Sequence, residues 1–137
     1  MRLIPSLVAV AAVVACRDAN PFVPTIDNMA GDYTAHAIVT TDRSGTVDWI
    51  AAGATLTMSL AQNGTTSGHL FVPGGGAAGA DVNEDMAGTW LFIGGTVSFG
   101  QTADSFVRNM DFVPTPNRLS SDHTFSDGTR FRVVLTK

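Results

Sequence analysis

The sequence predicts an all-β domain, and its simplest form is a single eight-stranded antiparallel barrel of the up-and-down kind. From Gly31 onward, apolar and polar residues alternate in short runs, and no segment keeps a helical period. Turn-forming pairs such as Asn63-Gly64 and Gly94-Gly95 separate these runs. A short meander of this kind removes its exposed edges by closing on itself. A two-sheet β-sandwich built from the same strands is the alternative.

Alternation is clearest between Ala54 and Gln62, where Leu56, Met58 and Leu60 face one side and polar residues face the other. Asn63-Gly64 then suits a type I′ hairpin, because both central residues of that turn need positive φ. The predicted strands are Asp32–Thr41, Ala54–Gln62, Thr65–Val72, Met86–Ile93, Thr96–Gln101, Asp104–Val113, Arg118–Phe125 and Thr129–Thr136.

Two connections differ from hairpins. Asp48–Ala52, bounded by Gly53, is typical of one helical turn between the first two strands. Pro73–Asp85 is the longest loop and is rich in glycine, so it is the segment expected to move over a ligand.

The N-terminal residues have the pattern of an export signal. Arg2 precedes an apolar run, Leu7–Ala15, that is much shorter than the about 20 residues a membrane-spanning helix needs. The run ends in Val13-Val14-Ala15-Cys16, which resembles the lipobox of bacterial lipoproteins. That resemblance implies cleavage before Cys16 and lipid on its thiol, and two or more acyl chains anchor a protein stably.

This interpretation divides the chain into a signal peptide (1–15), a lipidated cysteine with a tether (16–28) and a barrel domain (29–137). Pro21 and Pro24 favour an extended tether, about 30 Å long at about 3 Å per residue. Arg17, rather than aspartate, follows Cys16, and this resembles the sorting of lipoproteins to the outer membrane of diderm bacteria. The expected location is therefore the cell envelope, with the membrane as a partner through the lipid on Cys16.

Composition limits the possible partners. The chain has a net charge of −4 and no run of lysine or arginine, which argues against nucleic acid and against electrostatic adhesion to anionic lipid. Cys16 is its single cysteine, so the domain is expected to rely on core packing without a disulfide.

A short pattern occurs twice, as Met29-Ala30-Gly31-Asp32-Tyr33 and as Met86-Ala87-Gly88-Thr89-Trp90, each time at a predicted strand start. The Gly-x-aromatic opening resembles that of the lipocalin and avidin superfamily, the calycins. The resemblance implies an aromatic ring that plugs the closed end of a barrel. It also implies an arginine of the last strand packed across that ring, and Arg130 and Arg132 lie in the matching strand.

No pattern for catalysis or metal binding stands out. A Gly-x-Ser-x-Gly elbow is absent, and His36, His69 and His123 lack the close spacing of a helical metal motif. The acidic stretch Asp81–Asp85 lacks the glycine and the distal glutamate of a calcium loop, so it is interpreted as solvated. We expect neither an enzyme nor a bound cofactor.

Arg108 is the most unusual polar residue, because it shares strand parity with Phe106, Met110 and Phe112 and is therefore predicted to point inward. There it would meet a ligand carboxylate, although an internal ion pair, a rim position or a bulge would also explain it. Tyr33, Trp49 and Trp90 are the other candidate ligand-binding residues.

The expected function is a binding module for a small hydrophobic ligand. A packed barrel that contacts or inhibits another envelope protein is the alternative. A solvent-open cavity of about 300 Å³ separates the two. A large apolar set is expected to fill much of the interior, namely Phe92, Val97, Phe99, Phe106, Met110, Phe112, Phe125 and Phe131.

Overall fold

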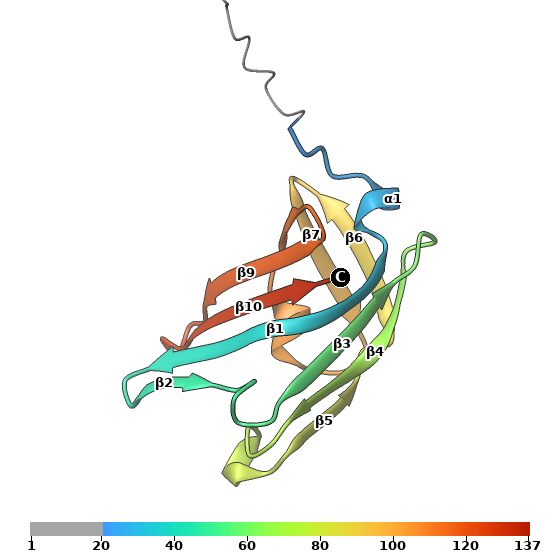
Figure 1. The fold of residues 1–137 in the computed structure, drawn as a ribbon. Helices are drawn as coiled ribbons and strands as arrows, with labels where there is room; N and C mark the ends of the chain where they lie inside the picture. Colours follow the sequence, from blue (N-terminus) through green and yellow to red (C-terminus); the bar gives the residue numbers. More distant parts are fainter. Residues whose placement is uncertain (1–20) are drawn as a thin grey trace, which may run out of the picture.

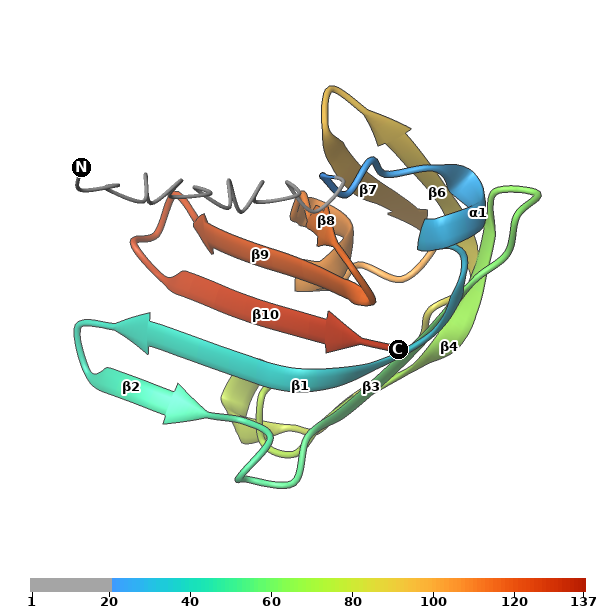
Figure 2. The same cartoon turned by 45° about the horizontal axis from the view of Figure 1, so that its top comes forward.

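The computed structural model describes residues 21–137, so Cys16 and the predicted signal peptide lie outside the described residues. The described chain forms one antiparallel sheet that curls into a nearly closed barrel (Figures 1 and 2). Its strands are β1 (Gly31–Asp42), β2 (Gly45–Asp48), β3 (Thr55–Leu60), β4 (Thr65–Val72), β5 (Val82–Asp85), β6 (Gly88–Ile93), β7 (Thr96–Gln101), β8 (Val113–Thr115), β9 (Arg118–Thr124) and β10 (Arg130–Thr136). The helical elements are α1 (Ile26–Met29) and two 3-10 turns, Ala77–Gly79 and Phe106–Asn109.

The strand order β7-β6-β4-β3-β1-β10-β9-β8 confirms the up-and-down barrel and excludes the sandwich. The first and last strands, β1 and β10, pair with each other, and β1 pairs with β3 on its other side. The remaining seam is bridged where Val97 and Phe112 exchange two backbone hydrogen bonds of 2.7 and 2.9 Å. This bridge brings β7 against the segment before β8, so the barrel is nearly closed at this seam.

The short strands β2 and β5 were not predicted. Each pairs with only part of a longer strand. The first part of β1 pairs with β3 and its last part pairs with β2, while its pairing with β10 on the other side has a register shift between Ala35 and Ala37. In the same way β4 pairs with β5 along one half and with β6 along the other. The predicted loop Pro73–Asp85 therefore contains β5 at its end.

The predicted strand Asp104–Val113 is wrong. Residues Phe106–Asn109 form a 3-10 turn, and the strand begins only at Val113. Val107, Met110 and Phe112 are the buried residues of this segment. Val107 and Met110 are three residues apart, which is the spacing of one face of a 3-10 turn. The alternation of Phe106, Met110 and Phe112, which fits a strand, was therefore misleading.

The last residues of the predicted tether are helical, because α1 begins at Ile26. Thr25 and Asn28 form a reciprocal capping box, in which the Thr25 side chain accepts from the Asn28 backbone and the Asn28 side chain accepts from the Thr25 backbone. Met29, which follows, is 1% exposed and belongs to the barrel core. The extended conformation predicted up to Asn28 is therefore wrong for the helical residues.

The turns follow the predicted positions more closely than the predicted types. Gly94 and Gly95 have φ of 63° and 85°, as a type I′ turn requires, whereas only Gly64 of the Asn63-Gly64 pair has positive φ. That hairpin closes instead by a hydrogen bond from Ala61 N to Thr65 O of 2.9 Å, which makes a three-residue loop. The helical turn after β2 is confirmed by a bond from Ala52 N to Asp48 O.

The barrel interior is packed with apolar side chains from every wall. Val97, Phe99, Met110 and Phe112 are buried as predicted, and four methionines contribute to the same core. Within the described residues, no helix has the length and apolar character needed to cross a membrane. The packed core limits any binding site to the ends or the outer surface of the barrel.

Candidate functional site at the open end of the barrel

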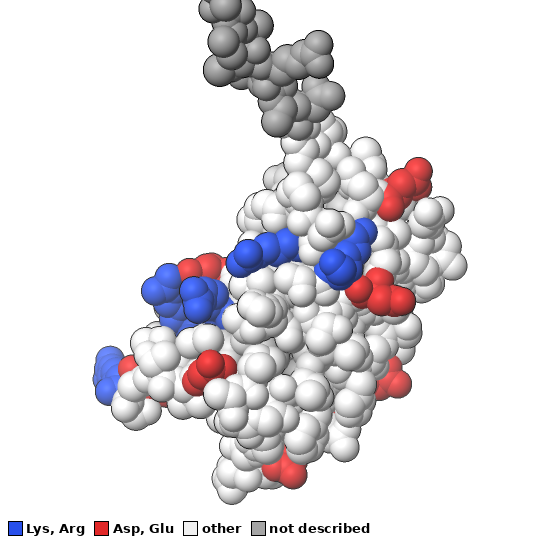
Figure 3. Space-filling model, viewed as in Figure 1, with Lys and Arg blue, Asp and Glu red and all other residues white. Residues whose placement is uncertain are grey.

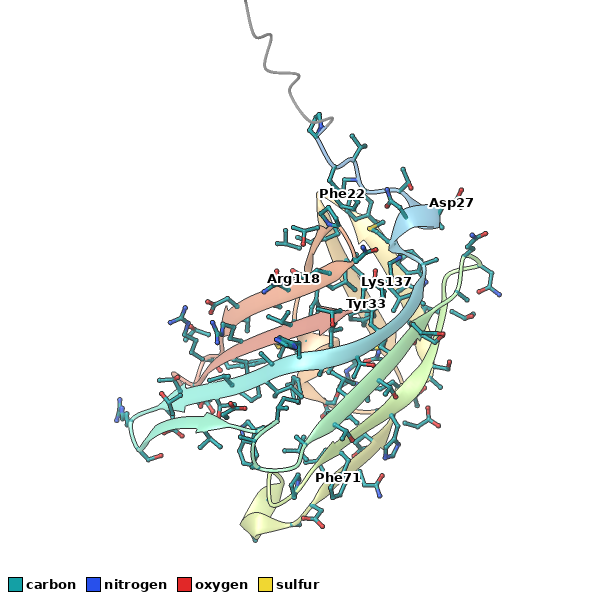
Figure 4. All side chains as sticks on the ribbon, in the orientation of Figure 1. Phe22, Asp27, Tyr33, Phe71, Arg118 and Lys137 are labelled. Atoms are coloured by element: carbon teal, nitrogen blue, oxygen red, sulfur yellow. The ribbon has the colours of Figure 1, made fainter. Side chains whose placement is uncertain are left out.

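The end of the barrel beside α1, here called the closed end, is covered by Tyr33 and Lys137. Tyr33 Oη donates a 2.7 Å hydrogen bond to Met29 O, and burial raises the pKa of this phenol. Lys137 Nζ donates to Asn28 O and Ala30 O at 2.6 and 2.7 Å. Figure 4 shows both residues close to the start of β1. Tyr33 is thus part of a plug at this end of the barrel.

The cation over the Tyr33 ring is Lys137, at 5.5 Å from the ring centre. The arginine implied by the resemblance to calycins does not take this place. Arg130 instead forms a bidentate pair with Asp122, and this guanidinium lowers the pKa of the Asp122 carboxyl. Arg132 lies on the outer surface of β10.

Trp90 is also a core residue. Its side chain is 2% exposed, and its Nε1 donates a 2.8 Å hydrogen bond to Ala61 O in the neighbouring hairpin. Tyr33 and Trp90 therefore correspond in the two copies of the repeated motif. In each copy the methionine is buried, the glycine begins a strand and the aromatic ring fills the interior.

The opposite end, here called the open end, contains a small apolar pocket. Its volume is about 80 Å³. Among the predicted candidates, Trp49 is the one that lines it, and Trp49 Nε1 donates to Thr40 Oγ1 at 2.9 Å. That bond fixes the indole at the mouth and satisfies its polar atom. The complete lining is Ile38, Thr40, Trp49, Val72, Gly75, Val82, Phe106 and Phe131.

One wall of the pocket belongs to a row of aromatic rings in tilted and edge-to-face contact. The ring centres of Phe106 and Phe131 lie 5.1 Å apart, and those of Phe131 and Phe125 lie 5.2 Å apart. His123 contacts the other side of Phe125 at 4.6 Å, edge to face. Such pairs restrain one another, so the wall is preformed. Phe106 reaches it because the 3-10 turn projects this residue toward β10.

The facing wall comes from the loop between β4 and β5. Val72 and Val82 are paired across these strands, and Asp81 accepts a 2.8 Å hydrogen bond from Gly74 N that closes the loop. Gly75 tolerates no side chain here, since a Cβ would lie 2.5 Å from a methyl group of Val72. The glycine-rich loop predicted to cover a ligand therefore borders the pocket.

A polar groove of about 430 Å³ adjoins this pocket. It lies between the β1–β2 turn and the β9–β10 turn. Its residues Asp42 and Thr129 are each two positions along the chain from the pocket residues Thr40 and Phe131. Ser44 donates two hydrogen bonds to Asp42, which hold the pKa of this carboxyl below its ordinary value. The groove is lined by Asp42, Arg43, Ser44, Asp127, Gly128 and Thr129.

Arg108 does not point into the barrel. It lies in the 3-10 turn, and its guanidinium pairs with Asp104 at 2.5 Å while 35% of its side chain is exposed. The inward orientation predicted from strand parity is wrong, because the segment is not a strand. The pair with Asp104 is exposed, so it also differs from the internal ion pair that was one of the alternatives.

The other candidate polar residues remain apart. His36, His69 and His123 are exposed on three different strands. Asp81 and Asp85 accept hydrogen bonds from backbone amides, and the stretch between them is mostly strand β5. Within residues 21–137 no three metal-binding side chains come together.

Most of the pocket residues were not identified from the sequence. Phe106 and Phe131 belong to the predicted apolar set, but Ile38, Thr40 and Val82 have no distinguishing pattern. The comparisons with known proteins add no relative, since no family model, no curated protein and no solved structure matches the chain.

Proposed function

We propose that the chain is a non-catalytic binding module of the cell envelope, and that its open end binds a partner protein. The observation that supports this most directly is the pairing of an apolar pocket with a polar groove on one surface. Protein interfaces have the same anatomy, with an apolar centre inside a polar rim.

The size of the pocket favours a protein side chain over a lipid. A pocket for a whole small molecule usually has at least about 300 Å³, and this one has about 80 Å³. The barrel below it is filled by its own core. A single apolar side chain, seated against the Phe106–Phe131 wall, matches the space and would act as the anchor of the interface.

A small hydrophobic ligand is the second candidate, and the lining favours it. Apart from Thr40 and Gly75, the pocket is bordered by apolar or aromatic residues. Even an engineered cavity that binds benzene is larger, at about 150 Å³. Such a ligand would therefore require the loop between β4 and β5 to move outward.

The proposed lipid on Cys16 would orient the pocket relative to the membrane. The described chain enters at the closed end, next to α1, and the loop between β4 and β5 lies at the far end of the barrel (Figures 1 and 2). Residues of this loop and its flanking strands line the pocket. An anchor on Cys16, in the outer membrane as the sorting residue favours, would leave the open end directed away from the lipid and available to partners.

Site-specific photo-crosslinking in cells tests the proposal. A benzophenone amino acid replaces Ala51, an exposed residue of the turn that carries Trp49, so it reports on the mouth without filling the pocket. The matched control replaces Ser67, an exposed residue of β4. We expect a discrete protein adduct at position 51 that position 67 does not give. A small-molecule adduct would favour the second candidate, and identical behaviour of both positions would contradict the proposal.

A further inference from the structure

We propose that the closed end of the barrel contacts the lipid surface of the membrane through the side chains of Val23, Ile26, Leu91 and Ile93. This inference rests on the proposed lipid anchor at Cys16 and adds to it the face of the domain that meets the membrane. The contact is apolar, so it does not depend on a basic surface.

These four side chains are unusually exposed for large apolar residues. Val23 is 66% exposed, Ile26 is 44%, Leu91 is 57% and Ile93 is 69%. In the described part of the chain, the other large apolar residues with this exposure are Val47 and Val113. Val47 lies on β2, away from the closed end (Figure 1). Four of these six side chains therefore belong to the segment before α1, to α1 itself and to β6.

The geometry of β6 explains why Leu91 and Ile93 face outward. Trp90 points into the core. Successive side chains of a strand point to opposite faces, so Leu91 and Ile93 point away from the core. Gly94 and Gly95 then turn the chain, which leaves Ile93 at the tip of the β6–β7 hairpin. Figures 1 and 2 show this tip at the same end of the barrel as α1.

Val23 and Ile26 are held at the same end by the cap of α1. Asn28 Nδ2 donates to Val23 O at 2.9 Å, and the capping box joins Thr25 to Asn28. Figure 4 shows Phe22, just before Val23, beside the upper ends of β6 and β7. The segment before α1 and the β6–β7 hairpin thus form one end surface.

The reach of the chain brings this surface close to the proposed anchor. Cys16 and Pro21 are five residues apart, so even a fully extended chain separates them by at most about 18 Å. The closed end is therefore the end nearest the membrane. Figure 3 shows acidic and basic groups among the uncharged surface at this end. Its ionic groups include Asp27, Arg118 and Lys137 (Figure 4), which would remain hydrated at the level of the lipid head groups.

Spin-label depth measurements on the lipidated full chain in vesicles of phosphatidylethanolamine and phosphatidylglycerol test the inference. Because lipid occupies the thiol of Cys16, a nitroxide attaches only to an introduced cysteine. Ile93→Cys and Val23→Cys probe the closed end, and Val47→Cys is the matched control at another exposed valine. Collision with oxygen, relative to collision with a water-soluble nickel complex, is expected to be severalfold higher at positions 93 and 23 than at 47.

Two negative results are distinguishable. Mass spectrometry of the N-terminal peptide reports whether Cys16 carries lipid. Lipid on Cys16 with equal, water-like accessibility at all three positions would overturn the orientation alone. A Cys16 without lipid would overturn both the anchor and the orientation.

Discussion

The ammonium group of Lys137 lies over the ring of Tyr33 and donates hydrogen bonds to the carbonyl oxygens of Asn28 and Ala30. One side chain therefore connects the end of β10, the start of β1 and the C-terminal end of α1. Cations are favourable at helix C-termini, where carbonyl oxygens lack partners within the helix. The closed end is held together by this contact and by Tyr33.

Replacing Lys137 should loosen the closed end. Lys137→Met keeps the length of the side chain and removes its donors, and we expect the free energy of unfolding to fall by about 1 kcal/mol. Urea denaturation of the purified chain measures this. Arg43→Met, in the exposed turn between β1 and β2, is the control that should leave stability unchanged. Equal stability of both variants with the parent would show that Lys137 contributes nothing.

Tyr33 should make the stability of the fold depend on alkaline pH. Burial raises the pKa of Tyr33 in the folded state, so its contribution is fully present below about pH 10, the unfolded value, and is lost as pH rises through the folded pKa. It is the single tyrosine of the chain, so phenolate absorbance reports its titration directly. Tyr33→Phe should abolish this phenolate signal and cost about 1 kcal/mol at neutral pH. A tyrosine that titrates with its ordinary pKa would contradict the account.

Gln101 should be replaceable with a gain in stability. Its side chain is 3% exposed, its Nε2 contacts the sulfur of Met58 at 3.1 Å, and its Oε1 has no hydrogen-bond partner among the described residues. An unpaired buried polar atom is destabilising, so Gln101→Met should raise the free energy of unfolding by about 1 kcal/mol. Thermal and urea denaturation check this. Gln101→Glu, which adds a buried charge, should have the opposite sign; a stabilised Glu variant would refute the assignment.

Among the glycines in the barrel strands, Gly68 should be the one whose replacement lowers stability most. Its φ is 136°, and a Cβ at this position would lie 2.1 Å from the backbone oxygen of Thr57 on β3. Gly68→Ala must push β3 and β4 apart and is expected to cost more than about 2 kcal/mol. Gly128→Ala provides the comparison, because that glycine also has positive φ but open space around it. If the two variants lose the same stability, close packing of β3 on β4 is not the cause.

The sequence predicted the barrel because hairpin turns and alternation are local signals. It failed between Asp104 and Val113, where burial of Val107 and Met110 follows a 3-10 period while Met110 and Phe112 also fit a strand. It also failed at α1, since four residues held by a capping box show no helical periodicity.

The site was less predictable than the fold. Trp49 was identified because an aromatic residue in a turn is conspicuous. Ile38 and Val82 meet only when the loop between β4 and β5 folds over the mouth, which no local pattern encodes. Arg108 was misplaced because its predicted direction depended entirely on the strand that did not form.

If the open-end pocket binds the partner, a side chain that fills the pocket should block binding. Val82→Phe places a ring into the about 80 Å³ of space, and Val113→Phe adds the same ring to the outer surface of β8. With the photo-crosslinker at position 51, the account predicts that Val82→Phe abolishes the adduct and that Val113→Phe retains it. An adduct of undiminished yield in a folded Val82→Phe protein would contradict the claim.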